Sequence, residues 1–220
     1  MTADDPDGEP GTADDDAGLR RRRAVLAGHG GDHDSAALLS TDLDPTVRSA
    51  ALGALSRLGA LDEETLLRAL GDPDPGVRRR ACTLAGRTRA SATSSTVVAD
   101  ALARSTADTD PSVVEAAAWA LGEAGGRCAR EAVAELCRVA ADHRSPVCRE
   151  AAVAALGAVG APDTLPVILA ALDDTPNIRR RAAVALAAFD DPAAEDGLRR
   201  CLGDRDWQVR QAAEELLAAR

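Results

Sequence analysis

The side chains best suited to metal binding are few and poorly placed for it. His29 and His33 flank Gly30-Gly31-Asp32, and Asp34 follows. Imidazole and carboxylate groups can hold a metal ion, but a glycine-rich linker would not fix them, and the spacing matches no established ligand motif. His143 stands alone in an expected loop, and we expect it to be exposed. The sequence therefore indicates no metal site.

The five cysteines do not form a recognisable chemical group. They include no Cys-x-x-Cys pair, and their odd number and irregular spacing do not suit a disulfide framework or a zinc site (Cys82, Cys128, Cys137, Cys148, Cys201). Cys82, Cys137 and Cys148 stand where a repeated motif places small apolar residues, so we expect reduced core side chains. No glycine-rich phosphate loop or nucleophile elbow is present either. We therefore expect no catalytic residue and no cofactor.

Arginine and aspartate recur at fixed positions along the chain. An arginine follows a valine-like residue at Arg20, Arg48, Arg78, Arg149, Arg179 and Arg210, with Val114 as the exception. Aspartates recur just before the same segments, at Asp44, Asp74, Asp110 and Asp206 and two residues earlier at Asp42, Asp72, Asp108 and Asp204. We expect each arginine to pair with an aspartate of the neighbouring layer, which would fix the stacking register. An exposed pair of this kind contributes under about 1 kcal/mol.

Three arginine clusters exceed what such a ladder needs. They are Arg20 to Arg23, Arg78 to Arg80 and Arg179 to Arg181. Two interpretations stay open: the additional arginines form a basic stripe for an acidic partner, or they serve solubility.

These charged residues belong to a repeated helical unit. Asp74-Pro75-Gly76-Val77-Arg78 is one of seven copies, whose second residues fall at 17, 45, 75, 111, 146, 176 and 207. Every copy begins with Asp, Ser or Thr, which caps a helix, and proline follows in five of them. Gly59, Gly86, Gly125 and Gly160 are expected to end these helices. Shorter apolar runs between them predict a first helix for each hairpin, at 63–70, 97–102, 132–139, 165–172 and 194–202.

The motif Asp-Pro-x-Val-Arg-x-x-Ala-Ala-x-Ala-Leu-Gly, repeated at a period near 31, resembles HEAT repeats. It is most similar to the short subtype first recognised in phycobilisome bilin-lyase subunits. The resemblance covers residues 17 to 219 and implies an all-α fold, a right-handed α-solenoid of about seven helical hairpins with the second helices on the concave face. That family includes chromophore lyases, metal hydroxylases, scaffolds and adaptors. The hydroxylases bind two irons through His-Glu pairs, which this chain lacks, because Gly, Asp and Arg follow its three histidines.

The amino-acid composition limits the kinds of partner that the surface can bind and the kinds of organism from which the protein comes. All 26 basic residues are arginine, aspartate outnumbers glutamate 25 to 11, and the net charge is −10. Such a surface repels nucleic acid and anionic membranes. The composition resembles that of proteins from salt-loving archaea, and a GC-rich bacterium is an alternative source.

Residues 1–16 carry seven acidic side chains and no basic one, so we expect a disordered tail rather than a secretory signal, followed by the repeat array at 17–220. No apolar stretch approaches a membrane span, and we expect a cytoplasmic protein.

The third repeat departs from the others and marks a candidate binding surface. Val114 replaces the recurring arginine, and Trp119 stands where other copies hold Gly53, Thr83, Ala154, Val184 or Glu215. Tryptophan is enriched among interface hot spots. We therefore expect a partner protein to bind the concave face at Glu115, Trp119, Glu150, Arg180 and Arg181. The competing interpretation of Trp119 is that it fills a gap made by the insertion at 87–96.

Taken together, the sequence predicts a non-catalytic scaffold or adaptor. The partner is a protein of unknown identity, and a second HEAT-repeat subunit is one candidate. The alternative function is a bilin-lyase-like accessory enzyme that handles a cofactor on a partner protein.

Overall fold

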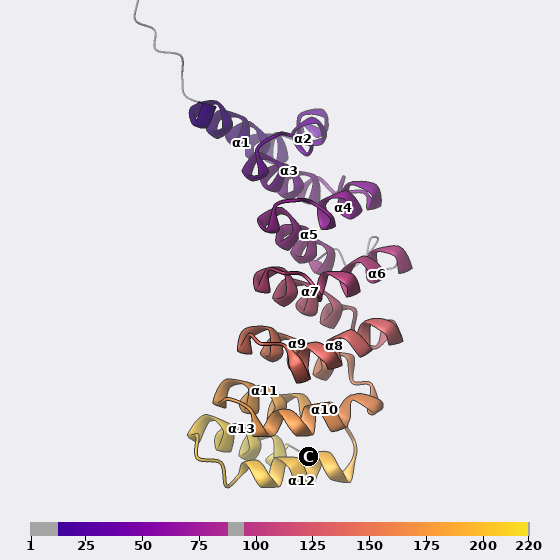
Figure 1. The fold of residues 1–220 in the computed structure, drawn as a ribbon, viewed down its shortest axis with the longest axis vertical. Coiled ribbons are helices and arrows are strands. Elements are labelled where there is room, and N and C mark those ends of the chain that lie inside the picture. The colour runs from indigo at the N-terminus through magenta and orange to yellow at the C-terminus, as the bar shows by residue number, and fades with distance from the viewer. Residues whose placement is uncertain (1–12, 88–94, 220) are drawn as a thin grey trace, which may run out of the picture. The chain divides into compact units, whose positions relative to one another are not determined.

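The computed structural model describes residues 13–87 and 95–219, and every regular element within these ranges is helical (Figure 1). The chain divides into two compact units, Met1–Leu61 and Asp62–Arg220. Along the described residues, no helix is both long and apolar enough to cross a membrane.

The first unit contains α1 (Ala13–Gly30), α2 (His33–Leu39) and α3 (Pro45–Arg57). The three helices pack against one another through small and aliphatic side chains. Its two apolar clusters are Ala24, Leu39, Val47 and Ala51, and Ala27, Ala36, Ala54 and Leu55. Close packing depends on glycine, because a Cβ added at Gly28 would lie 2.8 Å from the Cα of Ala54.

The start of the chain differs from the sequence prediction. Helix α1 begins at Ala13, within the segment expected to be the tail, and residues 1–12 of that segment lie outside the described residues. Asp16 therefore lies inside the helix, where its carboxylate pairs with Arg20 at 2.6 Å instead of capping the first turn. An acidic side chain near a helix N-terminus is favourable, which helps to explain the earlier start.

The predicted glycine-rich linker around the histidines is also shorter than expected. His29 lies in the last turn of α1 and His33 is the first residue of α2, so only Gly31 and Asp32 separate the helices. Asp32 caps α2 by accepting the N–H of Ser35 at 2.9 Å. Within the described ranges, no group of three or more His, Cys, Asp or Glu side chains is placed to hold a metal ion.

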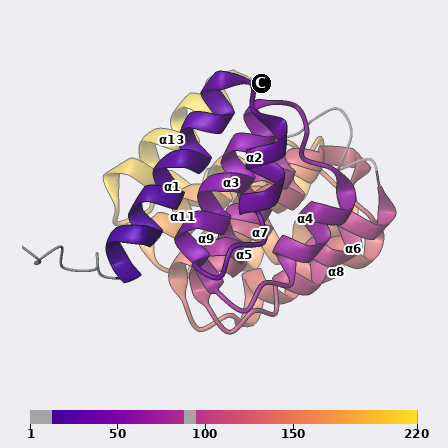
Figure 2. The same ribbon diagram turned by 90° about the horizontal axis from the view of Figure 1, so that it is seen from above.

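The second unit is an α-solenoid of five hairpins. They are α4 (Glu63–Leu70) with α5 (Pro75–Arg87), α6 (Thr96–Ser105) with α7 (Pro111–Ala124), α8 (Arg130–Asp142) with α9 (Pro146–Val159), α10 (Leu165–Ala170) with α11 (Pro176–Leu186), and α12 (Pro192–Cys201) with α13 (Trp207–Ala218). Short 3₁₀ turns lie at Gly125–Arg127, Pro162–Thr164 and Ala171–Asp173. Each second helix packs on the next second helix, and each first helix on the next first helix (Figures 1 and 2).

The helix starts follow from local chemistry. The helices α3, α5, α7, α9, α11 and α13 begin at 45, 75, 111, 146, 176 and 207, the positions at which the sequence predicts them. Asp44, Asp74, Asp110 and Asp206 accept first-turn N–H groups, and Asp62 and Asp191 cap α4 and α12 in the same way. Ser145 and Thr175 were also expected to cap, but their side chains make no cap hydrogen bond with any described residue.

Glycine serves two distinct purposes in the helices. Gly59, Gly125 and Gly160 have positive φ values of 67°, 57° and 65° and lie at helix ends, as predicted. The prediction for Gly86 is wrong, because Gly86 lies inside α5. A Cβ there would lie 2.6 Å from the ring of Trp119 and 3.0 Å from the Cα of Ala120, so glycine allows α7 to approach α5.

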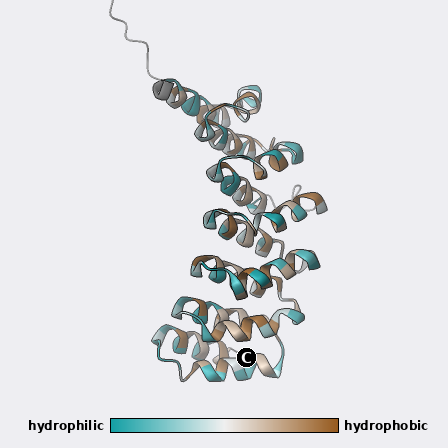
Figure 3. Cartoon of the chain, viewed as in Figure 1, coloured by the Kyte–Doolittle hydropathy of each residue, from teal (hydrophilic) through white to brown (hydrophobic). Residues whose placement is uncertain are grey.

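The core of the second unit lies between its two helix layers. Val77, Val113, Cys148, Ile178 and Val209 are at most 1% exposed and come from successive second helices. The first helices contribute side chains that are fully buried, namely Leu66, Leu102, Leu136, Ile168 and Leu198. Apolar and polar residues alternate around each helix (Figure 3). The recurring valine of the motif is therefore a core residue. The opposite face of each second helix is exposed and remains available to a partner.

Candidate functional site

Arginine side chains join neighbouring layers of the second unit. Arg78 donates through Nε and Nη2 to both carboxylate oxygens of Asp108, at 2.7 and 2.9 Å. Its Nη1 donates to the carbonyl of Asp72 in its own loop at 2.8 Å. Arg149 pairs in the same way with Asp174, and Arg179 with Asp204, at distances of 2.7 to 2.8 Å. One guanidinium therefore fixes two successive loops.

Of the two sets of aspartates expected in the ladder, the structure pairs arginines with the set two residues before the capping positions, and it adds Asp174. Its carboxylates are Asp108, Asp174 and Asp204, with Asp42 paired to Arg20 in the first unit at 2.7 Å. The predicted Asp44, Asp74, Asp110 and Asp206 cap their own helices instead. A capping carboxylate must face the helix of its own layer, which leaves the aspartate two residues earlier to face the preceding layer. Of the other predicted arginines, Arg48 donates to the carbonyls of Asp42 and Leu43, and Arg210 donates to that of Asp204.

These pairs shift the acid–base behaviour of the carboxyls. Hydrogen bonds from arginine hold the pKa of Asp108, Asp174 and Asp204 below the usual value, with burial acting in the opposite direction. A carboxyl with a lowered pKa stabilises the fold above its unfolded pKa of about 3.9, and this contribution is lost as the pH falls through the folded pKa. The ladder is therefore fully charged at neutral pH.

The ladder is interrupted between α7 and α9. Val114, which is 0% exposed, replaces the arginine of α7, and His143 replaces the aspartate that would face it. His143 still performs the local task of the aspartate, because its Nδ1 accepts the N–H of Ser145 at 3.1 Å. A weaker contact also joins these layers: the Cys148 thiol donates to the Pro111 carbonyl at 3.3 Å. Both members of the ion pair are thus replaced together.

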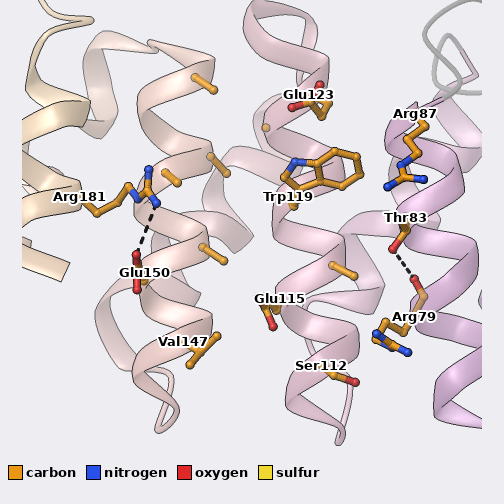
Figure 4. A pocket seen from close by; sticks show the side chains of 16 residues that line it. Arg79, Thr83, Arg87, Ser112, Glu115, Trp119, Glu123, Val147, Glu150 and Arg181 are labelled. Atoms are coloured by element: carbon orange, nitrogen blue, oxygen red, sulfur yellow. Dashed lines mark hydrogen bonds and ion pairs between the residues drawn. The ribbon is translucent and has the colours of Figure 1, made fainter. Parts of the chain in front are cut away.

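A groove of about 570 Å³ lies on the second helices beside this interruption, and we call it the central groove (Figure 4). All its lining residues come from α5, α7, α9 and α11. Four of the five predicted binding residues line it, namely Glu115, Trp119, Glu150 and Arg181. The fifth, Arg180, lines a neighbouring hollow of about 460 Å³ together with Arg181, Val184, Trp207, Gln208, Gln211, Ala212 and Glu215, and we call this the C-terminal hollow.

Trp119 is held against α5 while part of its ring remains exposed. Its six-membered ring packs over Gly86, and the side chain keeps 39% exposure. Figure 4 shows the ring extending from α7 toward Thr83 and Arg87 of α5. On the other side of α7, helix α9 contributes Val147, Glu150 and four alanines, and the methyl groups of Ala151, Ala154, Ala155 and Ala158 form the floor of the groove. The alternative for Trp119 concerned the insertion at 87–96, of which residues 88–94 lie outside the described residues.

Six charged side chains line the central groove, and they are arranged by helix. Arg79 and Arg87 come from α5, Glu115 and Glu123 from α7, Glu150 from α9 and Arg181 from α11. Only one ion pair joins them within the described residues, between Arg181 Nη2 and Glu150 at 3.5 Å. The Nε of Arg181 is buried and has no hydrogen-bond partner there, so this guanidinium is incompletely satisfied.

Sequence reasoning named Arg79 only as part of a possible basic stripe, and it missed Thr83, Arg87, Glu123 and the alanine floor of α9 as groove residues. The signal was present in the repeat register. Arg79, Glu115 and Glu150 stand four residues after the helix-starting prolines Pro75, Pro111 and Pro146. Thr83, Trp119 and Ala154 stand four residues later again. Aligning the repeats at these two positions identifies one exposed row per helix.

The cysteines do not contribute a nucleophile to this surface. All five are free, and burial raises the pKa of the Cys82 thiol to about 12. Burial likewise raises the pKa of Cys128, Cys137, Cys148 and Cys201. The reactive form of cysteine is the thiolate, so these thiols are poorly nucleophilic at neutral pH.

Comparison with solved structures places the fold among helical repeat proteins. YibA of Escherichia coli is 18% identical, with 99% of this chain and 77% of that chain covered and a TM-score of 0.66. A designed armadillo repeat protein in complex with the peptide (KR)4 is 14% identical, with coverage of 91% and 98% and a TM-score of 0.60. The complex of CpcE and CpcF of phycocyanin lyase from Nostoc is 20% identical, with coverage of 100% and 81% and a TM-score of 0.57.

No curated protein matches the sequence. The HEAT repeats family matches four overlapping segments, residues 35–122, 63–157, 99–184 and 133–218, which together span most of the chain. The stacked hairpins, the aspartate-capped second helices and the arginine that links successive layers are the structural form of that repeat in this molecule. The chain belongs to the HEAT repeats family.

Proposed function

We propose that this protein is a non-catalytic scaffold or adaptor that binds a partner protein on the exposed face of the second helices, centred on the central groove. The observation that carries the proposal is the groove itself: about 570 Å³, with the half-exposed Trp119 on one wall and an alanine floor. HEAT and armadillo-like repeats are scaffolds that typically engage proteins, because a row of stacked helices offers one continuous surface.

The anchoring of Trp119 supports this assignment. A binding anchor contributes most when its side chain is already ordered, because less conformational entropy is lost on association. Gly86 supplies that order, since it carries no side chain and lets the ring lie directly against α5. Charged side chains surround the apolar wall and floor, which matches the apolar centre and polar rim of protein interfaces.

The bilin-lyase-like alternative has less support. It rests on the likeness to CpcE and CpcF, which at 20% identity extends to the fold alone. Cysteine is missing from the described lining of the central groove, and its two hydroxyl groups make local hydrogen bonds, Thr83 to the carbonyl of Arg79 and Ser112 to the carboxylate of Asp110 that caps α7. We also propose that the protein is cytoplasmic and adapted to high salt, on the basis of its net charge of −10 and its lack of lysine.

The test is quantitative affinity capture from native lysate at high salt with three purified variants. Trp119→Ala should lose the captured partner. Ala154→Gln should also lose it, because it fills the floor without removing a contact that holds the fold. Trp207→Ala is the matched control, since Trp207 is the other tryptophan, is 61% exposed and lies outside the central groove.

Melting temperatures decide how the capture results are interpreted. Loss of the partner by Ala154→Gln at an unchanged melting temperature supports the proposal, whatever Trp119→Ala does to stability. Retention of the same partner by both groove variants would place the binding surface elsewhere and refute the proposal.

A further inference from the structure

Each helix of the central groove contributes charges of one sign only, basic on α5 and α11 and acidic on α7 and α9. The exposed row of α5 is Arg79, Thr83 and Arg87, and the facing row of α7 is Glu115, Trp119 and Glu123. Residues four apart lie on one face of a helix, so each row is a column of three side chains. The α5 row is thus basic at both ends with a neutral threonine at its centre, and the α7 row is acidic at both ends with a tryptophan at its centre.

These opposite rows do not neutralise each other. Within the described residues, Arg79, Arg87, Glu115 and Glu123 make no ion pair within 4.0 Å. The ring of Trp119 lies across Gly86 between the two rows (Figure 4). By contrast, Glu150 of α9 is already paired with Arg181. The two rows therefore keep their charge available for a ligand.

We propose that the occupant of the central groove is an extended segment of the partner protein in which an acidic and a basic residue stand about three positions apart. The acidic residue pairs with Arg79 or Arg87 over α5, and the basic residue lies on Trp119 between Glu115 and Glu123. This inference rests on the proposed function and deepens it, because it specifies the chemistry of the partner.

The spacing follows from geometry. Packed helices lie about 8–10 Å apart, and an extended chain advances about 3.3 Å per residue. A segment that crosses from α5 to α7 therefore uses about three residues. The half-exposed indole of Trp119 attracts a cation through its ring face, and a carboxylate one turn away on each side strengthens that preference.

Segments of uniform charge fit the groove less well. The groove is lined by three arginines and three glutamates, so its net charge is zero. A wholly basic peptide is attracted by the glutamates of the α7 row but repelled by the arginines of the α5 row. A wholly acidic peptide is attracted by the α5 row and repelled by the α7 row. Only a segment with both signs satisfies both rows at once.

The experiment is a selection of random 12-residue peptides displayed on phage against the full chain carrying Trp207→Phe. The chain has two tryptophans, so this background leaves Trp119 as the sole tryptophan fluorophore. Peptides that also bind the Trp119→Ala version are removed. We expect the enriched sequences to share an acidic and a basic residue two to four positions apart, and their synthetic versions to shift the emission of Trp119.

Matched variants then test each charge. We expect Trp119→Ala to weaken a selected peptide on the order of thirtyfold, as for an interface hot spot. Glu115→Gln or Glu123→Gln should each weaken it up to about fivefold, as for a partly exposed ion pair. The double variant Arg79→Glu/Arg87→Glu should reject the selected peptides and accept versions in which the acidic residue is replaced by arginine.

Other outcomes overturn the inference. Enriched peptides of a single charge sign, peptides without charge, or binding that is insensitive to the charge-reversed variant would each refute it. If such peptides still depend on Trp119, the charge inference fails while the proposed function stands. If no peptide depends on Trp119, the extended-segment inference fails, and the capture experiment with Ala154→Gln separately decides the proposed function.

Discussion

Replacing Arg179 by alanine tests the structural ladder at its most buried rung. The Arg179 side chain is 6% exposed and that of Asp204 13% exposed. The substitution removes two hydrogen bonds of 2.8 Å to the carboxylate of Asp204 and one of 2.9 Å to the carbonyl of Asp174. The carboxylate of Asp204 then keeps one hydrogen bond among the described residues, from the N–H of Asp206 at 2.8 Å.

The expected cost lies between that of a surface pair and that of a fully buried one. An exposed ion pair contributes under about 1 kcal/mol, whereas leaving one partner of a buried pair alone costs about 3–5 kcal/mol. Water reaches the 13% of Asp204 that is exposed, which relieves part of that penalty. We expect a loss of about 2–4 kcal/mol in the free energy of unfolding of the layers around α11 to α13.

The measurement is urea unfolding followed by far-UV circular dichroism, with hydrogen exchange to locate the effect. Arg180→Ala is the matched control, because Arg180 is the adjacent arginine on the same helix and lines the C-terminal hollow instead of the ladder. We expect exchange to accelerate in α12 and α13 for Arg179→Ala only. The double variant Arg179→Met/Asp204→Asn should recover part of the loss, since no unpaired charge remains.

The pH dependence provides an independent check on the same rung. The hydrogen bond from Arg179 lowers the pKa of Asp204, so the rung stabilises the fold above the unfolded pKa of about 3.9 and weakens as the pH falls through the folded value. The stability difference between the native protein and Arg179→Ala should therefore shrink in acid. Equal costs for Arg179→Ala and Arg180→Ala, or a difference that persists in strong acid, would refute the ladder.

Three further predictions concern the interrupted rung, the helix contacts and the surface charge. Val114→Arg alone should cost about 3–5 kcal/mol because the site is buried, and adding His143→Asp should restore part of it; a double-mutant cycle without favourable coupling would contradict an interrupted ladder. Gly157→Ala should lower the urea midpoint, because its Cβ would lie 2.7 Å from that of Ala185, whereas Gly18→Ala, with nothing within 4 Å, should raise it. Stability should rise steeply between dilute buffer and molar KCl, since the Debye length falls to about 3 Å at 1 M and screens the excess carboxylates; equal stability in both would contradict salt adaptation.

The helices and their repeat could be predicted from the sequence because their determinants are local. A capping aspartate, a proline with a preset φ and an apolar residue every three or four positions all act within one or two turns. The same reasoning located the exposed tryptophan, because Trp119 departs from the small residues found at the equivalent position of other repeats. It failed for Gly86, since the sequence alone does not distinguish a glycine that ends a helix from a glycine that allows a close contact between helices.

Tertiary structure decided which groups meet. Asp108 and Asp110 are two residues apart and chemically identical, yet only the stacking of layers turns the first toward Arg78 and leaves the second to cap α7. The central groove likewise exists only because the alanines of α9 lie next to Trp119 of α7 once the layers stack. Local sequence thus determined each helix and its period, while the side-chain partners and the hollow depended on the approach of helices about 30 residues apart in the chain, a contact that no short-range pattern records.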